Sequence, residues 1–183
     1  TSPDGDTLGS ALGLVHMLRA MGKEAEAVCS DPVPGIYSFL PGADEVKIGG
    51  EGIGYPAVIA VDCADKCRFG KVAKFFEGAE TTANVDHHGT NDMYAAANWM
   101  EETAACGELI YRLIRELNVE LTADMATCLF NDIFKALDES FYLGHHFYNG
   151  EYCECVDGVY LTDKDKMVEF YARMVKDCEC PYT

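Results

Sequence analysis

Acidic and imidazole side chains stand at three separated places in the first half of the chain. Asp62 follows an apolar run, an Asp-His-His sequence occupies residues 86–88, and Asp4 and Asp6 precede an amphipathic stretch. Carboxylates brought together repel one another unless a cation lies between them. Carboxylate oxygens with imidazole nitrogens favour manganese, magnesium or another divalent metal. Two such ions sharing one carboxylate would activate a water molecule and clamp a phosphoryl group, which predicts phosphoester hydrolysis.

The segments that must position these residues alternate between strands and helices. Apolar residues three or four positions apart predict a helix from Thr7 to Met21, with Asp4 and Asp6 at its N-terminus. The run over 56–61 predicts a strand buried on both faces, and residues 82–85 predict a second strand. Asp62 and the Asp-His-His loop thus follow the C-terminal ends of parallel strands, where ligands bind in open sheets.

The remaining segments extend this pattern. Residues 25–29 and 96–100 suit short strands, 32–41 a loop or helical turn, and 68–76 a helix. Thr103 is expected to cap a helix over 104–117, and Thr122 a helix over 123–134. A last helix is predicted over 164–176. This order predicts an α/β fold in which a parallel sheet is flanked by helices.

Composition narrows the function classes. The 183 residues carry a net charge of −17, so the chain lacks the basic face that grips long duplex nucleic acid. The longest apolar runs are far shorter than the roughly 20 residues that cross a bilayer, and no membrane helix is expected. The first residues lack the parts of a secretory signal, and nine cysteines form an odd number. Both features predict a reducing cytoplasmic setting.

Three segments, in this order, resemble motifs I, II and III of the DHH phosphoesterases. They are Ser2-Pro-Asp-Gly-Asp-Thr-Leu-Gly-Ser10, Val61-Asp-Cys-Ala-Asp65 and Val85-Asp-His-His-Gly89. The resemblance is greatest to the branch of NrnA-type oligoribonucleases, pAp phosphatases and cyclic-dinucleotide phosphodiesterases. It implies a DHH domain over 1–133 that lacks its first strand, followed by a partial substrate-binding domain over 134–183.

The resemblance also implies a site with two manganese ions, with Mg²⁺ or another divalent ion as the alternative. Asp4 would hold one ion, Asp6 and His87 would hold the other, and Asp62 would bridge both. Taken singly, Asp4 and Asp6 more often serve as turn and N-cap residues than as ligands.

Further roles follow from the same motifs. His88 resembles the residue that contacts the substrate phosphate, so His88 and Asp62 are the predicted catalytic residues. Asp86 would orient the site from behind the ligands. The family's usual histidine before the acidic loop is missing here, and motif IV is not recognisable. Asp138 is a substitute metal ligand by position alone.

The predicted function is therefore a manganese-dependent phosphoesterase. Its expected partners are short oligoribonucleotides, pAp or linear and cyclic dinucleotides, and the sequence is compatible with a homodimer. One alternative is a haloacid-dehalogenase-like phosphatase that would form an aspartyl-phosphate at Asp4, because residues 4–7 echo an Asp-x-Asp loop. Another is a nucleotide- or metal-binding fragment without catalysis.

Overall fold

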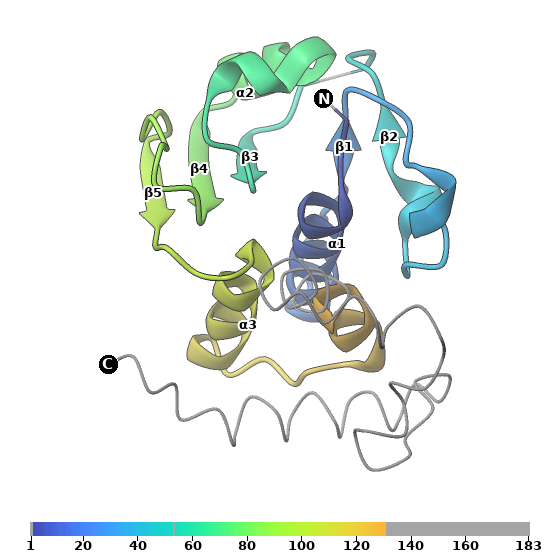
Figure 1. The fold of residues 1–183 in the computed structure, drawn as a ribbon. Helices are drawn as coiled ribbons and strands as arrows, with labels where there is room; N and C mark the ends of the chain where they lie inside the picture. Colours follow the sequence, from blue (N-terminus) through green and yellow to red (C-terminus); the bar gives the residue numbers. More distant parts are fainter. Residues whose placement is uncertain (1, 53, 131–183) are drawn as a thin grey trace, which may run out of the picture.

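A computed structural model of the protein describes residues 2–52 and 54–130 (Figure 1). Its labelled elements, in chain order, are α1 (Gly5–Ala20), β1 (Val28–Cys29), β2 (Lys47–Ile48), β3 (Ala57–Val61), α2 (Ala73–Gly78), β4 (Thr81–Asp86), β5 (Ala97–Met100) and α3 (Cys106–Glu116). Short 3₁₀ helices cover Gly35–Tyr37, Ala43–Glu45 and Lys66–Val72, and residues 123–130 are helical. Asp138, the predicted helix over 164–176 and the predicted domain over 134–183 lie outside the described residues.

The strands form two sheets, one with the order β3-β4-β5 and one made of β1 and β2. Every pairing in them is parallel. The predicted α/β fold with a parallel sheet flanked by helices is therefore confirmed. Val61 of β3 lies beside Val85 of β4, so Asp62 and Asp86, one residue further along each chain, reach the same edge of the sheet.

Helix α1 begins and ends where the sequence predicts, within two residues. The side chain of Asp4 accepts a hydrogen bond from the Thr7 amide at 3.0 Å, which caps the first turn. Gly22 follows the last turn with φ +73°, a left-handed conformation that glycine adopts without a steric cost. The helix therefore places its acidic N-terminus at a defined point.

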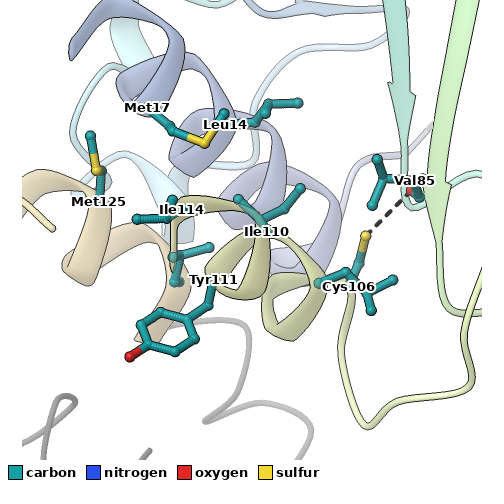
Figure 2. Close-up of a cluster of buried hydrophobic side chains, with 10 residues drawn as sticks. Leu14, Met17, Val85, Cys106, Ile110, Tyr111, Ile114 and Met125 are labelled. Atoms are coloured by element: carbon teal, nitrogen blue, oxygen red, sulfur yellow. Dashed lines mark hydrogen bonds between the residues drawn. The ribbon is translucent and has the colours of Figure 1, made fainter. Parts of the chain in front are cut away.

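Helix α1 also joins two hydrophobic clusters. Leu14 and Met17 contribute to the cluster in Figure 2, which also takes side chains from β4, α3 and the helical residues 123–130. Leu8 and Leu12 contribute to a second cluster, with residues from the turns that surround β2. Because one helix serves both clusters, the N-terminus of α1 is fixed relative to the ends of β3 and β4.

The expectation that 56–61 is buried on both faces is wrong. Strand β3 lies at the edge of its sheet, and 40% of Ile59 is exposed. The free edge of β3 faces a cleft of about 1200 Å³ that separates it from β1. Leu14 and Leu18 of α1 line this cleft with Val28 and Cys29 of β1. The apolar character of β3 is thus explained by the cleft as well as by the core.

The structure differs from the sequence prediction in two helices, those expected over 68–76 and 104–117. The helix expected over 68–76 is interrupted at Gly70, whose φ of +54° makes a kink within the 3₁₀ segment Lys66–Val72, and α2 begins only at Ala73. Thr103 does not cap α3, because its hydroxyl donates to the carbonyl of Ala105 and the helix begins at Cys106. The Thr122 cap is confirmed by a hydrogen bond from the Met125 amide at 3.3 Å.

Within residues 2–52 and 54–130, no helix is both long and apolar enough to cross a bilayer.

Candidate metal centre

The ends of β3 and β4 and the N-terminus of α1 bring four of the predicted residues together. Nε2 of His87 lies 3.3 Å from Oδ2 of Asp6 and 3.4 Å from Oδ1 of Asp62. Nδ1 of His88 lies 3.6 Å from the same Oδ1 of Asp62. The side chains of Asp6, Asp62 and His87 are largely buried, and that of His88 is 37% exposed. Residues separated by up to 82 positions in the sequence thus share one small volume.

Asp62 is the centre of this group. Its φ of +53° is unusual for a residue other than glycine, and such a backbone costs about 1–3 kcal/mol. Oδ2 accepts a hydrogen bond from the Thr7 hydroxyl at 2.6 Å. Oδ1 is buried and makes no hydrogen bond within the described part of the chain. A strained backbone therefore holds an unsatisfied carboxylate oxygen between two imidazoles.

Asp6 joins the site to helix α3. Both of its carboxylate oxygens lie 3.0 Å from the backbone nitrogen of Cys106, the first residue of that helix. The Ser10 hydroxyl donates to Oδ1 at 3.0 Å. Burial, together with the negative charge of Asp62, raises the pKa of Asp6 to about 6. The charged form of Asp6 is thus costly in the absence of a cation.

His87 is oriented by the main chain. Its Nδ1 lies 2.9 Å from the carbonyl oxygen of Thr103, to which it can only donate, and Nε2 therefore faces Asp6 and Asp62. A backbone carbonyl behind a metal-ligating imidazole fixes the ring and its tautomer. The contact with Asp62 raises the pKa of His87 to about 9, although burial opposes the shift. Without a metal ion, a proton on Nε2 offsets the two carboxylates.

The buried carboxylate of Asp86 orients His88. The Asp86 side chain is fully buried, and its Oδ1 accepts a hydrogen bond from Nδ1 of His88 at 2.7 Å. Its Oδ2 accepts a hydrogen bond from Nδ2 of Asn91 at 2.6 Å. Nε2 of His88 is not used in these contacts, and the ring lines the cleft.

Asp4 lies beside the group rather than in it. Its Oδ1 is 3.1 Å from the Thr7 hydroxyl, which is also the partner of Asp62. Asp4 therefore has the N-cap role and reaches the site through Thr7. Asp138 lies outside the described residues.

Sequence reasoning missed several residues that hold this site. Thr7 and Ser10 fall inside the first of the three motifs, and their positions three and four residues after the two aspartates could have indicated such contacts. Asn91 follows the Asp-His-His loop closely enough to be suspected. The Thr103 carbonyl gives no sequence signal, because any residue supplies that atom.

The donor set fits a divalent cation. Asp62, His87 and His88 each offer one atom that could bind a metal ion, and these atoms lie within 4.8 Å of one another. Oδ2 of Asp6 lies 3.3 Å from Nε2 of His87, so Asp6 can replace His88 in this set while His88 stays bonded to Asp86. A cation would satisfy the buried Oδ1 of Asp62 and replace the proton of His87. Oxygen with imidazole nitrogen, and no thiolate, suits manganese or a similar ion.

The fold and the site define a class of protein. The N-terminal domain of the DHH family matches residues 1–131, and the chain belongs to this family. This membership argues against the alternative of a haloacid-dehalogenase-like phosphatase, because the acidic loop at residues 4–7 lies within the part of the chain that matches the DHH domain.

Particular relatives refine the comparison. The bifunctional oligoribonuclease and PAP phosphatase NrnA of Thermus thermophilus is 39% identical over 127 residues, which are 68% of this chain and 37% of that protein. A probable manganese-dependent inorganic pyrophosphatase of Streptococcus thermophilus is 27% identical over 140 residues, covering 72% of this chain and 44% of that protein. The chain thus spans less than half the length of these curated relatives.

One solved structure supports the fold alone. The crystal structure of an exopolyphosphatase-related protein from Bacteroides fragilis matches with a TM-score of 0.72 at 19% sequence identity. The match covers 94% of this chain and 54% of that one.

Proposed function

We propose that this chain is the catalytic domain of a manganese-dependent phosphoesterase that hydrolyses short oligoribonucleotides, pAp, or linear or cyclic dinucleotides. The observation that carries the proposal is the buried Oδ1 of Asp62, which has no hydrogen bond in the described chain and lies 3.4 Å from Nε2 of His87. A divalent cation would satisfy this oxygen and offset the charge of Asp6 beside it.

The proposal assigns roles to the predicted residues. Asp6, Asp62 and His87 would hold one manganese ion, and Asp4 with Asp62 would hold a second. Asp138 is proposed as a further ligand from its sequence position alone. When bound, the two ions would activate a water molecule and stabilise the charge on the phosphoryl group.

His88 would contact the substrate at the end of the cleft that Asp4 and Asp62 also line. As an imidazolium it donates from Nδ1 to Asp86 and from Nε2 to a phosphate oxygen. Asp86 keeps the ring in this orientation, because its buried carboxylate accepts from Nδ1 at 2.7 Å. His88 is therefore proposed as the phosphate-binding catalytic residue, and Asp86 as its positioning residue.

The names of the relatives support the substrate and the metal. The Thermus relative is named for oligoribonuclease and PAP phosphatase activity, and the Streptococcus relative for manganese dependence. The net charge of −17 favours short phosphorylated substrates over long duplexes, which need a basic face. The odd number of cysteines, nine, supports the proposed cytoplasmic setting. The homodimer stays a prediction.

Turnover with and without Mn²⁺ tests the function directly. The 183-residue chain should release mononucleotide from a dinucleotide, or phosphate from pAp, only when Mn²⁺ is present. Asp62→Ala and His87→Ala should each abolish this activity, and His16→Ala, whose imidazole contacts the Pro41 carbonyl, should not. Unchanged turnover in either site variant would refute the assignment. Mn²⁺ binding without turnover would support the non-catalytic fragment instead.

We also propose that residues 1–133 form the DHH domain without its first strand, and that in a longer chain this strand would occupy the cleft between β1 and β3. The Ser2 amide donates to Asp31 at 2.8 Å, so residue 2 lies at the rim where β1 ends. A strand that ends at this rim would run parallel to both neighbours and join α1 by the usual right-handed crossover. In a chain extended before Thr1, the Ile59 amide should gain protection from hydrogen exchange. Equal protection in both chains would contradict the placement.

A further inference from the structure

Three side chains converge on one backbone carbonyl beside the proposed metal centre. The Cys63 carbonyl oxygen accepts from the Tyr94 hydroxyl at 2.8 Å, from Nδ2 of Asn91 at 3.3 Å and from Nδ2 of Asn84 at 3.4 Å. A carbonyl oxygen has two lone pairs, so three donors are an unusual concentration. This carbonyl belongs to the residue that follows Asp62, whose φ is +53°.

Asn91 connects this carbonyl to the other half of the site. The same Nδ2 group donates to Oδ2 of Asp86 at 2.6 Å, while Oδ1 of Asp86 holds His88. Oδ1 of Asn91 accepts from the Met93 amide at 2.7 Å, which fixes the orientation of the amide group. The loop that carries Asp62 and the loop that carries His88 are therefore tied by one side chain.

Tyr94 is held by its ring as well as by its hydroxyl. Its ring packs edge-on against Phe69, with centroids 5.5 Å apart, and against Phe76, with centroids 5.4 Å apart. Burial raises the pKa of Tyr94 above its usual range, so the hydroxyl stays protonated and remains a donor. The Cys63 carbonyl is thus anchored to the aromatic residues around α2.

We propose that Asn91 and Tyr94 are positioning residues that clamp the Cys63 carbonyl and thereby hold Asp62 in one geometry for the metal ion and keep the Asp86–His88 pair in register with it. The proposal rests on the metal site of the proposed function. Hydrogen-bond partners that lie behind metal ligands commonly change affinity by about 10–100-fold when they are removed. Neither residue touches the ion or the substrate in this role.

The experiment compares Asn91→Ala and Tyr94→Phe with the unaltered chain. Tyr55→Phe is the matched control, because it removes a hydroxyl that bonds Glu26 instead of the clamp. Calorimetry measures the dissociation constant of Mn²⁺. In the metal-free proteins, the ¹⁵N chemical shift of the Ala64 amide reports directly on the Cys63 carbonyl, because both belong to the same peptide group.

We expect Asn91→Ala to weaken Mn²⁺ binding about tenfold or more, since it breaks both connections at once. Tyr94→Phe should weaken it by about 3–10-fold, the effect of one neutral hydrogen bond. Both variants should shift the Ala64 nitrogen signal, and Tyr55→Phe should change neither quantity. An unchanged Ala64 signal and a dissociation constant within about twofold of the parent, in Tyr94→Phe, would overturn the clamp even if Asn91→Ala fails to fold.

The two proposals fail in different ways. If the unaltered chain binds no Mn²⁺, the proposed function fails, and the Ala64 signal of the metal-free variants alone decides whether the clamp exists. If the unaltered chain binds Mn²⁺ and the variants bind it equally well, the clamp is overturned while the metal site stands.

Discussion

The two sheets contribute unequally to the site. The three-stranded sheet supplies Asp62 from the end of β3 and the Asp-His-His residues from the end of β4, with hydrogen bonds behind each of them. The loop after β1 supplies Asp31, which accepts a hydrogen bond from the amide of Ser2. Ligands gather where parallel strands end in register, and the β1-β2 side serves as a wall of the cleft.

Burial also differs between the helical side of the site and the side that faces the cleft. Helix α3 buries Leu109, Ile110 and Ile114 completely against α1 and its neighbours, whereas Ile59 on β3 faces the cleft. The candidate site is therefore packed against buried helices on one side and open on the side of β1. Four experiments test this difference between the two sides of the molecule.

The largest difference is expected between two aspartates near the start of the chain. Asp6→Ala removes a carboxylate 3.3 Å from Nε2 of His87 and should lower Mn²⁺-dependent turnover by about 10²–10³-fold, as loss of a key electrostatic group does. Asp31→Ala, at the end of β1, should change turnover by less than about threefold. Steady-state kinetics measure both, and equal losses would mean that the β1 side belongs to the site.

A second contrast concerns stability. Leu109→Ala empties a fully buried position in the helical cluster and should lower the free energy of unfolding by about 2–5 kcal/mol. Ile59→Ala, on a side chain that is 40% exposed, should cost less than about 1 kcal/mol. Urea denaturation of the two variants measures the difference. A cost of several kcal/mol at Ile59 would show that the free edge of β3 is buried in solution.

The third prediction uses pH to separate the site from the rest of the fold. The folded-state pKa values of Asp6, about 6, and His87, about 9, are both raised, so their contribution is complete at low pH and is lost as pH rises through these values. At the proposed site Mn²⁺ would replace these protons and would therefore bind more tightly at higher pH. The rise in Tm on adding Mn²⁺ should therefore grow from pH 6 to pH 9. A rise that shrinks over this range would contradict the assignment.

The smallest effect is expected at Thr103. Its carbonyl, not its hydroxyl, holds Nδ1 of His87 at 2.9 Å, and α3 does not use it as a cap. Thr103→Ala should change turnover by less than about twofold, since the backbone atom remains. Thr103→Pro, which restricts the backbone at the same position, should lower turnover clearly more. Equal effects of the two changes would argue against a backbone role.

Local sequence patterns are enough to predict the main helices and strands of this fold. The spacing of apolar residues and the position of Asp4 predicted α1, and the strand-helix alternation predicted parallel pairing. The two loops after β3 and β4 were found because side chains that follow parallel strands meet at one edge. These inferences use information that lies within a few residues along the chain.

Contacts between distant residues account for the rest. The burial of β3 depends on whether another element covers its free edge, and an apolar sequence alone does not show this. The predicted burial on both faces is therefore wrong. The first amide of α3 donates to Asp6, 100 residues earlier in the chain. Asp6 therefore makes the capping contact that the sequence assigns to Thr103. The three donors on the Cys63 carbonyl likewise exist only in three dimensions.

The link between Asp6 and Cys106 gives the protein a built-in reporter. The Cys106 amide lies 3.0 Å from both oxygens of a carboxylate that is proposed to bind metal. A metal ion bound to that carboxylate would withdraw electron density from it and weaken its hydrogen bond with the Cys106 amide proton. The NMR frequency of this single proton should therefore follow Mg²⁺ occupancy during a titration. It would report the filling of the ion position that Asp6 is proposed to share, with a diamagnetic ion and no substrate.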